Sequence, residues 1–245
     1  LGFILNYFAY QLNINLAFFN CNSCIPASTL LINIHSHQPP AHNQWLIQNL
    51  YRHFEQSAAN GYYSIGLHPW YINETTLAQQ MEELNNYCNN KNVLAIGECG
   101  LDKVCSTDFA LQQNAFSQQI VMANAINKPL IIHCVKAFEE VQFLLQQQKV
   151  KVPVIFHGFN KSRQLALQLV DKGYYLSFGK ALQLPAMQQV LASVPLQQFF
   201  LETDDAEMPI DNIYAVAAPA LQIDINTLSL QLKKNAAAVF GNAVL

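Results

Sequence analysis

Charged side chains are scarce in this chain of 245 residues, and basic ones are especially few. Asp, Glu, Lys and Arg together make up 12% of the sequence, about half of the usual share. The formal net charge is −3, and the 13 Lys and Arg residues form no dense basic run. The sequence therefore lacks the electrostatic footprint of a dedicated nucleic-acid-binding protein. Any phosphate-containing substrate would have to be held mainly by metal ions and a few local donors.

Cysteine is too sparse and too scattered to organise the fold. The six Cys residues stand at positions 21, 24, 88, 99, 105 and 134, which matches neither the dense framework of a small secreted domain nor a paired zinc-binding spacing. Cys21 and Cys24 form a CxxC pair, but no second pair follows it and no strand-to-helix redox context surrounds it. We therefore expect reduced thiols and a cytoplasmic location.

The beginning of the chain lacks the features of a secretory signal or a membrane span. No Lys or Arg precedes Arg52, and Asn and Gln interrupt the apolar run over 1–19. Residues 1–28 are either an N-terminal extension packed on the body or the product of a start-site misassignment ahead of a natural beginning near Thr29, which we favour. We expect 29–245 to form a single domain, because barrels of this length fold as one unit, and we expect no membrane association.

Eight short apolar runs bounded by turn residues predict β-strands. Segments with helical periodicity separate most of them, at 74–90, 108–126, 136–148, 161–172, 185–193 and 227–240. The runs cover 30–35, 45–51, 62–67, 93–98, 129–133, 153–157, 173–178 and 198–203. Asn73-Glu74 and Thr107-Asp108 are the expected caps of the helices that follow them.

This alternation predicts an α/β fold of the TIM (β/α)8 type, a parallel barrel with helices outside. An open doubly wound sheet is disfavoured, because its first strand should lead into a Gly-rich phosphate turn. The chain instead continues His35-Ser36-His37-Gln38-Pro39-Pro40. The second strand is the weakest prediction, since the roughly 25 residues between His37 and Tyr62 are too few for full helices on both of its sides.

Residue types that bind divalent metals stand at the ends of five of these runs. The five are His35, Glu98, His133, His157 and Asp204, and His37 follows two residues after His35. Side chains two apart in a strand point to the same face, so His35 and His37 can bind one metal together. Because a barrel collects its chemistry at the C-terminal ends of its strands, the predicted fold brings all six residues together.

The chemistry of this set favours two metal ions. Imidazole suits Zn, Mn, Fe or Ni, while two carboxylates keep Mg and Mn in consideration. Four His and two acids exceed what one catalytic ion with open positions needs, but they suit two ions that share a bridging carboxylate. The alternative, that these are ordinary polar residues at loop mouths, is reasonable for any one of them. It is disfavoured for the whole set, because five of the seven His residues, His68 included, fall in the same predicted layer.

Six motifs contain these residues. They are Asn33-Ile34-His35-Ser36-His37, Gly66-Leu67-His68-Pro69, Ala95-Ile96-Gly97-Glu98-Cys99-Gly100-Leu101-Asp102, Ile131-Ile132-His133, His157-Gly158-Phe159 and Leu201-Glu202-Thr203-Asp204. In this order along the chain they resemble the TatD family of metal-dependent hydrolases in the amidohydrolase superfamily. The resemblance covers residues 30–245 and extends to the closing segment from Asn235 to Phe240-Gly241.

The resemblance implies a TIM barrel with two divalent ions bridged by Glu98. It places His35, His37 and Asp204 on one ion and His133 and His157 on the other, and it makes Asp204 the general base that takes a proton from the attacking water. Glu98 and Asp204 are thus the expected catalytic residues.

The resemblance also implies a deoxyribonuclease that acts on DNA, chiefly single strands, with Mg favoured and Zn, Mn or Ni as alternatives. The same centre could serve another phosphate ester, an ester or an amide, and a non-catalytic barrel is the remaining alternative. The sequence does not indicate whether the chain pairs with itself.

Three positions near the predicted centre carry weaker expectations. Asn33 stands where the family usually has Asp, and we expect it to support a ligand without binding metal. Lys136 follows His133 where the family more often has Arg, and we expect it to contact the substrate as a point charge, with a solvated surface residue as the alternative. His68 is expected near the substrate, or else as a residue that orders its own turn.

Overall fold

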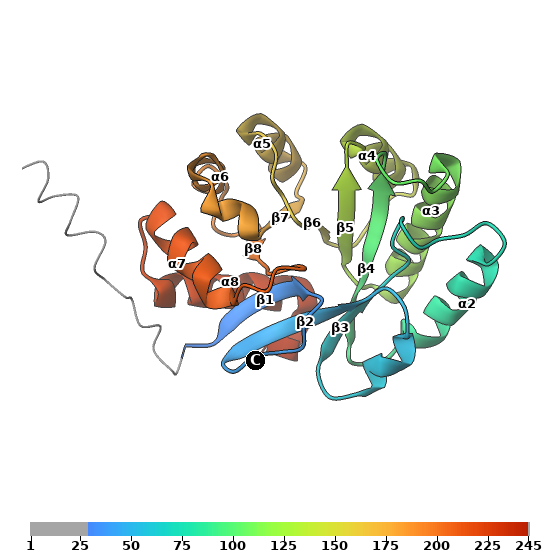
Figure 1. Ribbon diagram of the computed structural model, residues 1–245, viewed down its shortest axis with the longest axis horizontal. Coiled ribbons are helices and arrows are strands. Elements are labelled where there is room, and N and C mark those ends of the chain that lie inside the picture. The colour runs from blue at the N-terminus through green and yellow to red at the C-terminus, as the bar shows by residue number, and fades with distance from the viewer. Residues whose placement is uncertain (1–28, 245) are drawn as a thin grey trace, which may run out of the picture.

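The eight strands of this computed structural model, which describes residues 29–244, form one parallel sheet in sequence order (Figure 1). A bridge between Ser36 and Asp204 joins the first strand to the segment after the last one. All eight predicted strands are therefore present, and the predicted barrel-like α/β fold is confirmed. The strands are β1 Leu31–Ser36, β2 Gln44–Leu50, β3 Tyr62–Ile65, β4 Val93–Asp102, β5 Leu130–Val135, β6 Val154–Phe156, β7 Tyr175–Phe178 and β8 Phe199–Leu201. The predicted extension at 1–28 lies outside the described residues.

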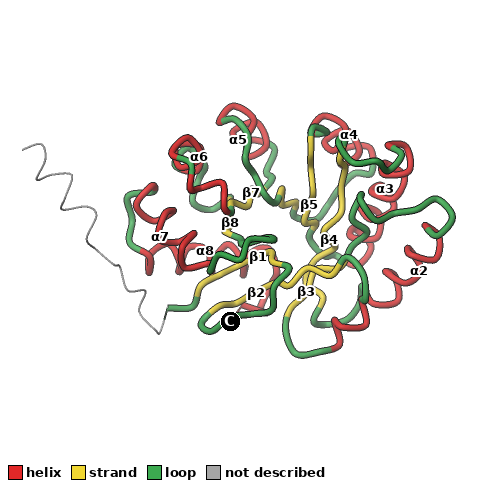
Figure 2. Tube along the Cα trace, viewed as in Figure 1, coloured by secondary structure: helices red, strands yellow, loops and turns green. Residues whose placement is uncertain are grey.

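The helices lie around the outside of the strands (Figure 2). No helix among the described residues is long and apolar enough to cross a membrane. The α-helices are α2 Leu77–Tyr87, α3 Phe109–Ile126, α4 Phe138–Gln147, α5 Arg163–Asp171, α6 Pro185–Leu191, α7 Ile210–Ala220 and α8 Ile225–Phe240, and the 3-10 helices are η1 Phe54–Ala58, η2 Lys180–Gln183 and η3 Gly241–Val244.

The alternation of strand and helix is incomplete at the start of the barrel. β1 leads into β2 without a helix, and β2 leads into β3 through η1 alone. This agrees with the short spacing after His37. One helix, α7, was not predicted. It contains Pro219 one residue before its end, and proline normally interrupts a helix.

Helix caps follow the predicted chemistry at one site and depart from it at another. Asp108 accepts a hydrogen bond from the Leu111 amide at 2.9 Å and so caps α3 as expected. The expected cap at Asn73 is wrong, because α2 begins at Leu77 with Thr76 as its N-cap residue. Asn73 instead accepts from the backbone and hydroxyl of Thr75 and closes a tight turn before the helix.

The barrel core is made of the apolar runs themselves. Strand side chains such as Ile32, Ile65, Ile96 and Ile131 are fully buried, as expected for parallel strands covered on both faces. Towards the C-terminal ends of the strands the buried residues become polar, and His35, Glu98 and Glu202 are among them. The apolar core therefore ends at a buried polar layer.

Contacts between β1 and the segment after β8 fix the place of Asp204. The Asp204 amide donates to the His35 carbonyl at 3.0 Å, and the His37 amide donates to the Asp204 carbonyl at 3.1 Å. Asn33 donates to the Thr203 hydroxyl at 3.0 Å and accepts from the Thr203 amide at 3.2 Å. Asn33 thus supports the position of Asp204 through its neighbour, and it does so by joining two segments about 170 residues apart.

Candidate metal centre

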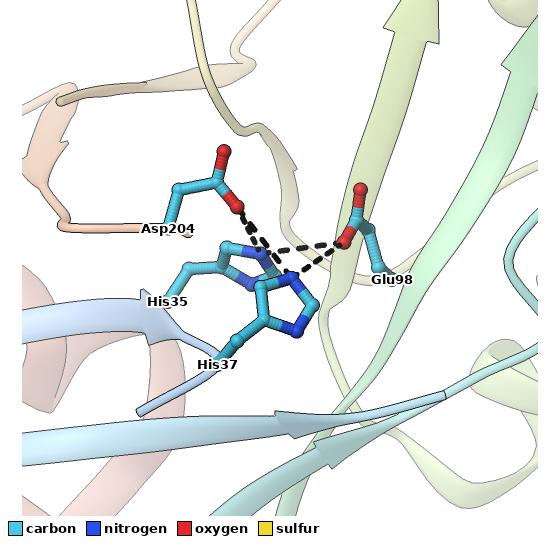
Figure 3. Close-up of side chains that lie close together, drawn as sticks. All are labelled: His35, His37, Glu98 and Asp204. Carbon is cyan, nitrogen blue, oxygen red and sulfur yellow. Dashed lines mark ion pairs between the residues drawn. The ribbon is translucent and has the colours of Figure 1, made fainter. Parts of the chain in front are cut away.

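Four of the predicted ligands converge on one point at the end of the barrel (Figure 3). His35 Nε2 lies 3.4 Å from Glu98 Oε2 and 3.5 Å from Asp204 Oδ1, and His37 Nε2 lies 3.6 Å from each of the same two oxygens. One ligand atom from each of the four residues lies within 4.8 Å of the others. The alternation of strand side chains therefore places His35 and His37 together as expected.

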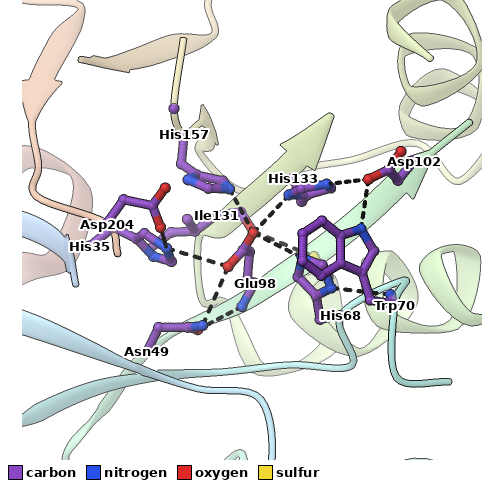
Figure 4. A network of polar contacts seen from close by, with 12 residues as sticks. His35, Asn49, His68, Trp70, Glu98, Asp102, Ile131, His133, His157 and Asp204 are labelled. Carbon is purple, nitrogen blue, oxygen red and sulfur yellow. Dashed lines mark hydrogen bonds and ion pairs between the residues drawn. The ribbon is translucent and has the colours of Figure 1, made fainter. Parts of the chain in front are cut away.

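Glu98 presents its second oxygen to three further imidazoles (Figure 4). Glu98 Oε1 lies 2.7 Å from His157 Nε2, 2.8 Å from His133 Nδ1 and 3.1 Å from His68 Nε2. One carboxylate thus separates two groups of nitrogen donors, each facing a different oxygen. A carboxylate placed in this way could bridge two cations.

The position of Glu98 within its strand differs from the prediction. Glu98 was expected to end its strand, but β4 continues to Asp102 and the residue lies in the middle of it. The register between β4 and β5 shifts between Ile96 and Cys99. The irregularity lets the Glu98 side chain reach the barrel centre although the strand continues beyond this residue.

The buried charges of this centre favour the ionised carboxylate. Burial alone would raise the pKa of Glu98, but His157, His133 and His35 outweigh it and hold that pKa well below its usual value. Burial and His157 lower the pKa of His35, yet Asp204 and Glu98 raise it to about 9. Burial likewise opposes ionisation of Asp204, whose pKa falls to about 2 beside His35. The acids therefore need nearby positive charge, which protonated imidazoles or bound cations can supply.

One further observation supports a fit between these nitrogen and oxygen donors and divalent cations. Neither ring nitrogen of the fully buried His35 has a hydrogen-bond partner among the described residues. Buried polar atoms without partners are costly, and a cation placed between His35, Glu98 and Asp204 would satisfy Nε2. His35, His37, Glu98 and Asp204 could hold one ion, and Glu98 with His68, His133 and His157 could hold another.

A second group of residues fixes the directions of these imidazoles. Asp102 Oδ2 lies 3.1 Å from His133 Nε2 and accepts from the Trp70 indole at 2.6 Å. Glu202 Oε1 lies 3.6 Å from His157 Nδ1 and accepts from the Gly158 amide at 2.6 Å. A carboxylate behind an imidazole sets its tautomer and orientation. Glu202 therefore has an orienting position behind His157.

Asn49 of β2 is a residue of the centre that sequence reasoning missed. It accepts from the Glu98 amide, and its own amide lies 3.5 Å from Glu98 Oε2. The available signal was an apolar run of the buried type interrupted by Gln48 and Asn49. Asp102 was also missed as a separate functional residue, although it belongs to the motif around Glu98.

The centre opens into two cavities. The larger holds about 540 Å³ and reaches past His37, His68 and Trp70 towards the residues after β2. The smaller holds about 170 Å³ and includes Lys161 and Phe159. His133, His157 and Asp204 line both cavities.

The two predicted substrate contacts have different surroundings. His68 lines the larger cavity but also forms a possible ligand group with Glu98 and His133, so binding of substrate and binding of metal both suit its position. Lys136 is exposed directly after β5 and does not line either of the two cavities. Its role in substrate binding stays a prediction. Lys161 is the lysine that the structure places at the centre's edge.

Solved structures with this arrangement of strands include a TatD homologue. The crystal structure of YJJV, a TatD homologue from Escherichia coli, superposes with a TM-score of 0.75 at 22% identity, covering 86% of this chain and 97% of that one. A phosphotriesterase homology protein from Escherichia coli, complexed with phosphate in its active site, gives a TM-score of 0.63 at 14% identity, covering 86% and 99%. These likenesses establish the fold.

Proteins similar in sequence are described as hydrolases or nucleases. An uncharacterized metal-dependent hydrolase from Buchnera aphidicola is 30% identical over 176 residues, which are 69% of this chain and 66% of that protein. The 3'-5' ssDNA/RNA exonuclease TatD of Pantoea ananatis is 31% identical over 147 residues, 57% of this chain and 55% of that protein. The matched parts thus span between about half and two thirds of these relatives. The sequence profile of TatD related DNase matches residues 29–241, and the chain therefore belongs to the TatD related DNase family.

Proposed function

We propose that this protein is a divalent-metal-dependent hydrolase that cleaves phosphodiester bonds of DNA. The observation that carries the proposal is the division of Glu98 between two donor groups, with His35, His37 and Asp204 on one side and three imidazoles on the other. Bridged pairs of cations are typical of enzymes that hydrolyse phosphate esters. The description of curated relatives as metal-dependent hydrolases supports the same class.

Two cations held in this way would polarise a phosphoryl group and make a water molecule more acidic at neutral pH. Asp204 is suited to receive the proton of that water, because its carboxylate lines both cavities and its side chain is 28% exposed. Its lowered pKa keeps the carboxylate ionised at neutral pH. His35 and His37 hold the same carboxylate in place from the other side.

The shape of the site supports a chain-like substrate. Asp204 lines both cavities, so a substrate could extend from the bond that is cleaved into each of them. Lys161 in the smaller cavity supplies one positive charge for a flanking phosphate. The relative described as a 3'-5' ssDNA/RNA exonuclease favours a nucleic-acid strand over a small ester.

Hydrolysis assays with defined metals test this proposal. Purified protein would be incubated with end-labelled single-stranded DNA and Mg, Mn, Zn or Ni, and in parallel with small phosphate monoesters, carboxylic esters and amides. We expect cleavage of DNA and its loss in Asp204→Asn, which keeps the shape of the side chain. Turnover of a small substrate without DNA cleavage would replace the nuclease assignment by another hydrolase, and bound metal without any turnover would indicate a non-catalytic barrel.

A further inference from the structure

Three aromatic side chains form one wall of the larger cavity, and we call Tyr51, Trp70 and Tyr71 the aromatic wall. The rings of Tyr51 and Tyr71 stack at 4.7 Å between centroids with 22° between their planes, and Trp70 meets Tyr71 at 6.4 Å. Tyr51 directly follows β2, whereas Trp70 and Tyr71 follow β3. The wall therefore depends on the pairing of two strands and not on one local motif.

Hydrogen bonds hold part of the wall in place, and the wall remains accessible. The Trp70 indole donates to Asp102 at 2.6 Å, and the Tyr71 amide donates to the His68 carbonyl at 3.0 Å. Even so, Trp70 is 53% exposed and Tyr71 is 50% exposed. Large aromatic side chains that are held in place while exposed are well suited to bind a flat ring at low entropic cost.

The wall directly adjoins the candidate metal centre. The ring of Tyr51 lies 5.9 Å from that of His37, and the ring of Tyr71 lies 5.5 Å from that of His68. A group stacked on the wall would thus be separated from the reacting bond by about one imidazole ring. This is the distance scale of a base attached through its sugar to the phosphate that is cleaved.

A positive charge lies on the same wall. The guanidinium carbon of Arg52 is 5.1 Å from the centroid of the Tyr51 ring, and the side chain is exposed. Within residues 29–244 no carboxylate forms an ion pair with Arg52. The guanidinium is therefore available to a phosphate, while its contact with the ring holds it near the cavity.

We propose that the aromatic wall binds an unpaired nucleobase next to the cleaved phosphodiester, with Arg52 contacting a neighbouring phosphate. This inference rests on the proposed function and adds the part of the substrate that is recognised. A base in a duplex has both faces covered by its neighbours, so a stacking wall selects single-stranded or frayed ends. Stacking accepts any base, because every base has a π-face.

Binding and kinetics together test the wall. The ligands are thymidine 5′-phosphate and 2-deoxyribose 5-phosphate, which differ by the base, and their affinities are measured by calorimetry with Mg²⁺ present. The substrates are a thymidine dinucleotide and the same compound with an abasic residue. Stacking of one base contributes a factor of about five to 150 in affinity. We expect wild-type protein to prefer both base-containing compounds by a factor in this range.

The variants separate stacking from general damage. Tyr71→Ala should lose most of the preference for the base while it binds 2-deoxyribose 5-phosphate normally, and Tyr71→Phe should retain the preference. Arg52→Gln should lower the affinity for both phosphates by the same factor. Phe143→Ala removes a ring that is 59% exposed on α4 and does not line the cavity, and this variant should match wild type.

Failure of the wall and failure of the proposed function give different results. The proposed base binding by the wall would be overturned if the wild type bound the two phosphates with equal affinity. It would also be overturned if Tyr71→Ala lost affinity for both by the same factor, even if the dinucleotide is cleaved. Absence of dinucleotide cleavage by wild type with a clear preference for the base in calorimetry would refute the nuclease activity and leave the wall as a nucleotide-binding surface. A Tyr71→Ala protein that does not fold is replaced by Tyr71→Leu, for which the same outcomes decide.

Discussion

Asn49 holds the carboxylate of Glu98 from a different strand. Asn49 Oδ1 accepts from the Glu98 amide at 2.8 Å, and Asn49 Nδ2 lies 3.5 Å from Glu98 Oε2. The Ser64 hydroxyl donates to the same Asn49 oxygen at 3.1 Å, which fixes the direction of the side-chain amide. Three neighbouring strands thus set the direction of the carboxylate on which the proposed two-ion centre depends.

Replacing Asn49 by Ala should weaken both the fold and the metal centre. The buried Glu98 amide would lose its acceptor, which costs about 1–3 kcal/mol of unfolding free energy. Metal affinity should fall about 10- to 100-fold, as for other residues that orient a ligand. Chemical denaturation and metal titration measure the two effects. Asn86→Ala, on the exposed side of α2, is the control, and equal affinity in the two variants would argue against this role.

Gly100 cannot be replaced by Ala without moving the strand that carries His133. A Cβ atom at Gly100 would overlap the His133 carbonyl oxygen, and the φ of +140° at this position is unfavourable for other residues. We expect Gly100→Ala to lose about 3 kcal/mol or more, in the range of overpacked cores. Gly173→Ala has φ of +82° but open space around it, so only about 1–2 kcal/mol of backbone strain is expected. Similar midpoints of denaturation for the two variants would contradict this account.

Asp102 should act through His133 rather than by binding metal itself. Asp102→Asn removes the charge beside His133 Nε2 and leaves one oxygen, which can accept either from the Trp70 indole or from the Val104 amide. We predict metal affinity reduced about 10- to 100-fold and a lower thermal midpoint of the metal-free protein, because one buried donor loses its acceptor. Calorimetric titration with Mn²⁺ measures the affinity, and the exposed Asp171→Asn is the matched control. Unchanged metal binding in Asp102→Asn would refute the orienting role.

Lys161 should contribute more to substrate binding than Lys136. Lys161 lines the smaller cavity beside His157, whereas Lys136 does not line either of the two cavities. Loss of one charged contact corresponds to about a ten-fold rise in KM on single-stranded DNA for Lys161→Ala. Lys136→Ala should stay close to wild type, and steady-state kinetics compare the two. A larger effect at Lys136 would restore the prediction made from its place after His133.

Much of the fold and of the centre could be predicted from the sequence, because both depend on local patterns. Apolar runs that end in ligand-type residues indicated the strands and five ligand candidates at once, and two-residue periodicity placed His37 beside His35. The helix at Ile210–Ala220 was not predicted. It contains Pro219 one residue before its end, although proline normally interrupts a helix.

The residues that were missed act across strands. Asn49 contacts Glu98 only because β2 and β4 lie close together in the barrel, and Tyr51 meets Tyr71 only because β2 pairs with β3. Nothing in the residues next to Asn49 or Tyr51 in the sequence predicts these partners. Lys161 likewise reaches the centre through the loop after β6, whereas reasoning from the sequence favoured the lysine nearest to His133.

The number of ions bound per chain tests the central claim most directly. Metal-free protein would be equilibrated with Mn²⁺ and analysed for bound metal, with Glu98→Gln as the variant that removes the bridging charge. A shared carboxylate predicts about two ions per chain for the wild type and at most about one for Glu98→Gln. A wild type that binds one ion or fewer at saturation, or a Glu98→Gln protein that binds as many ions as the wild type, would contradict the two-ion centre.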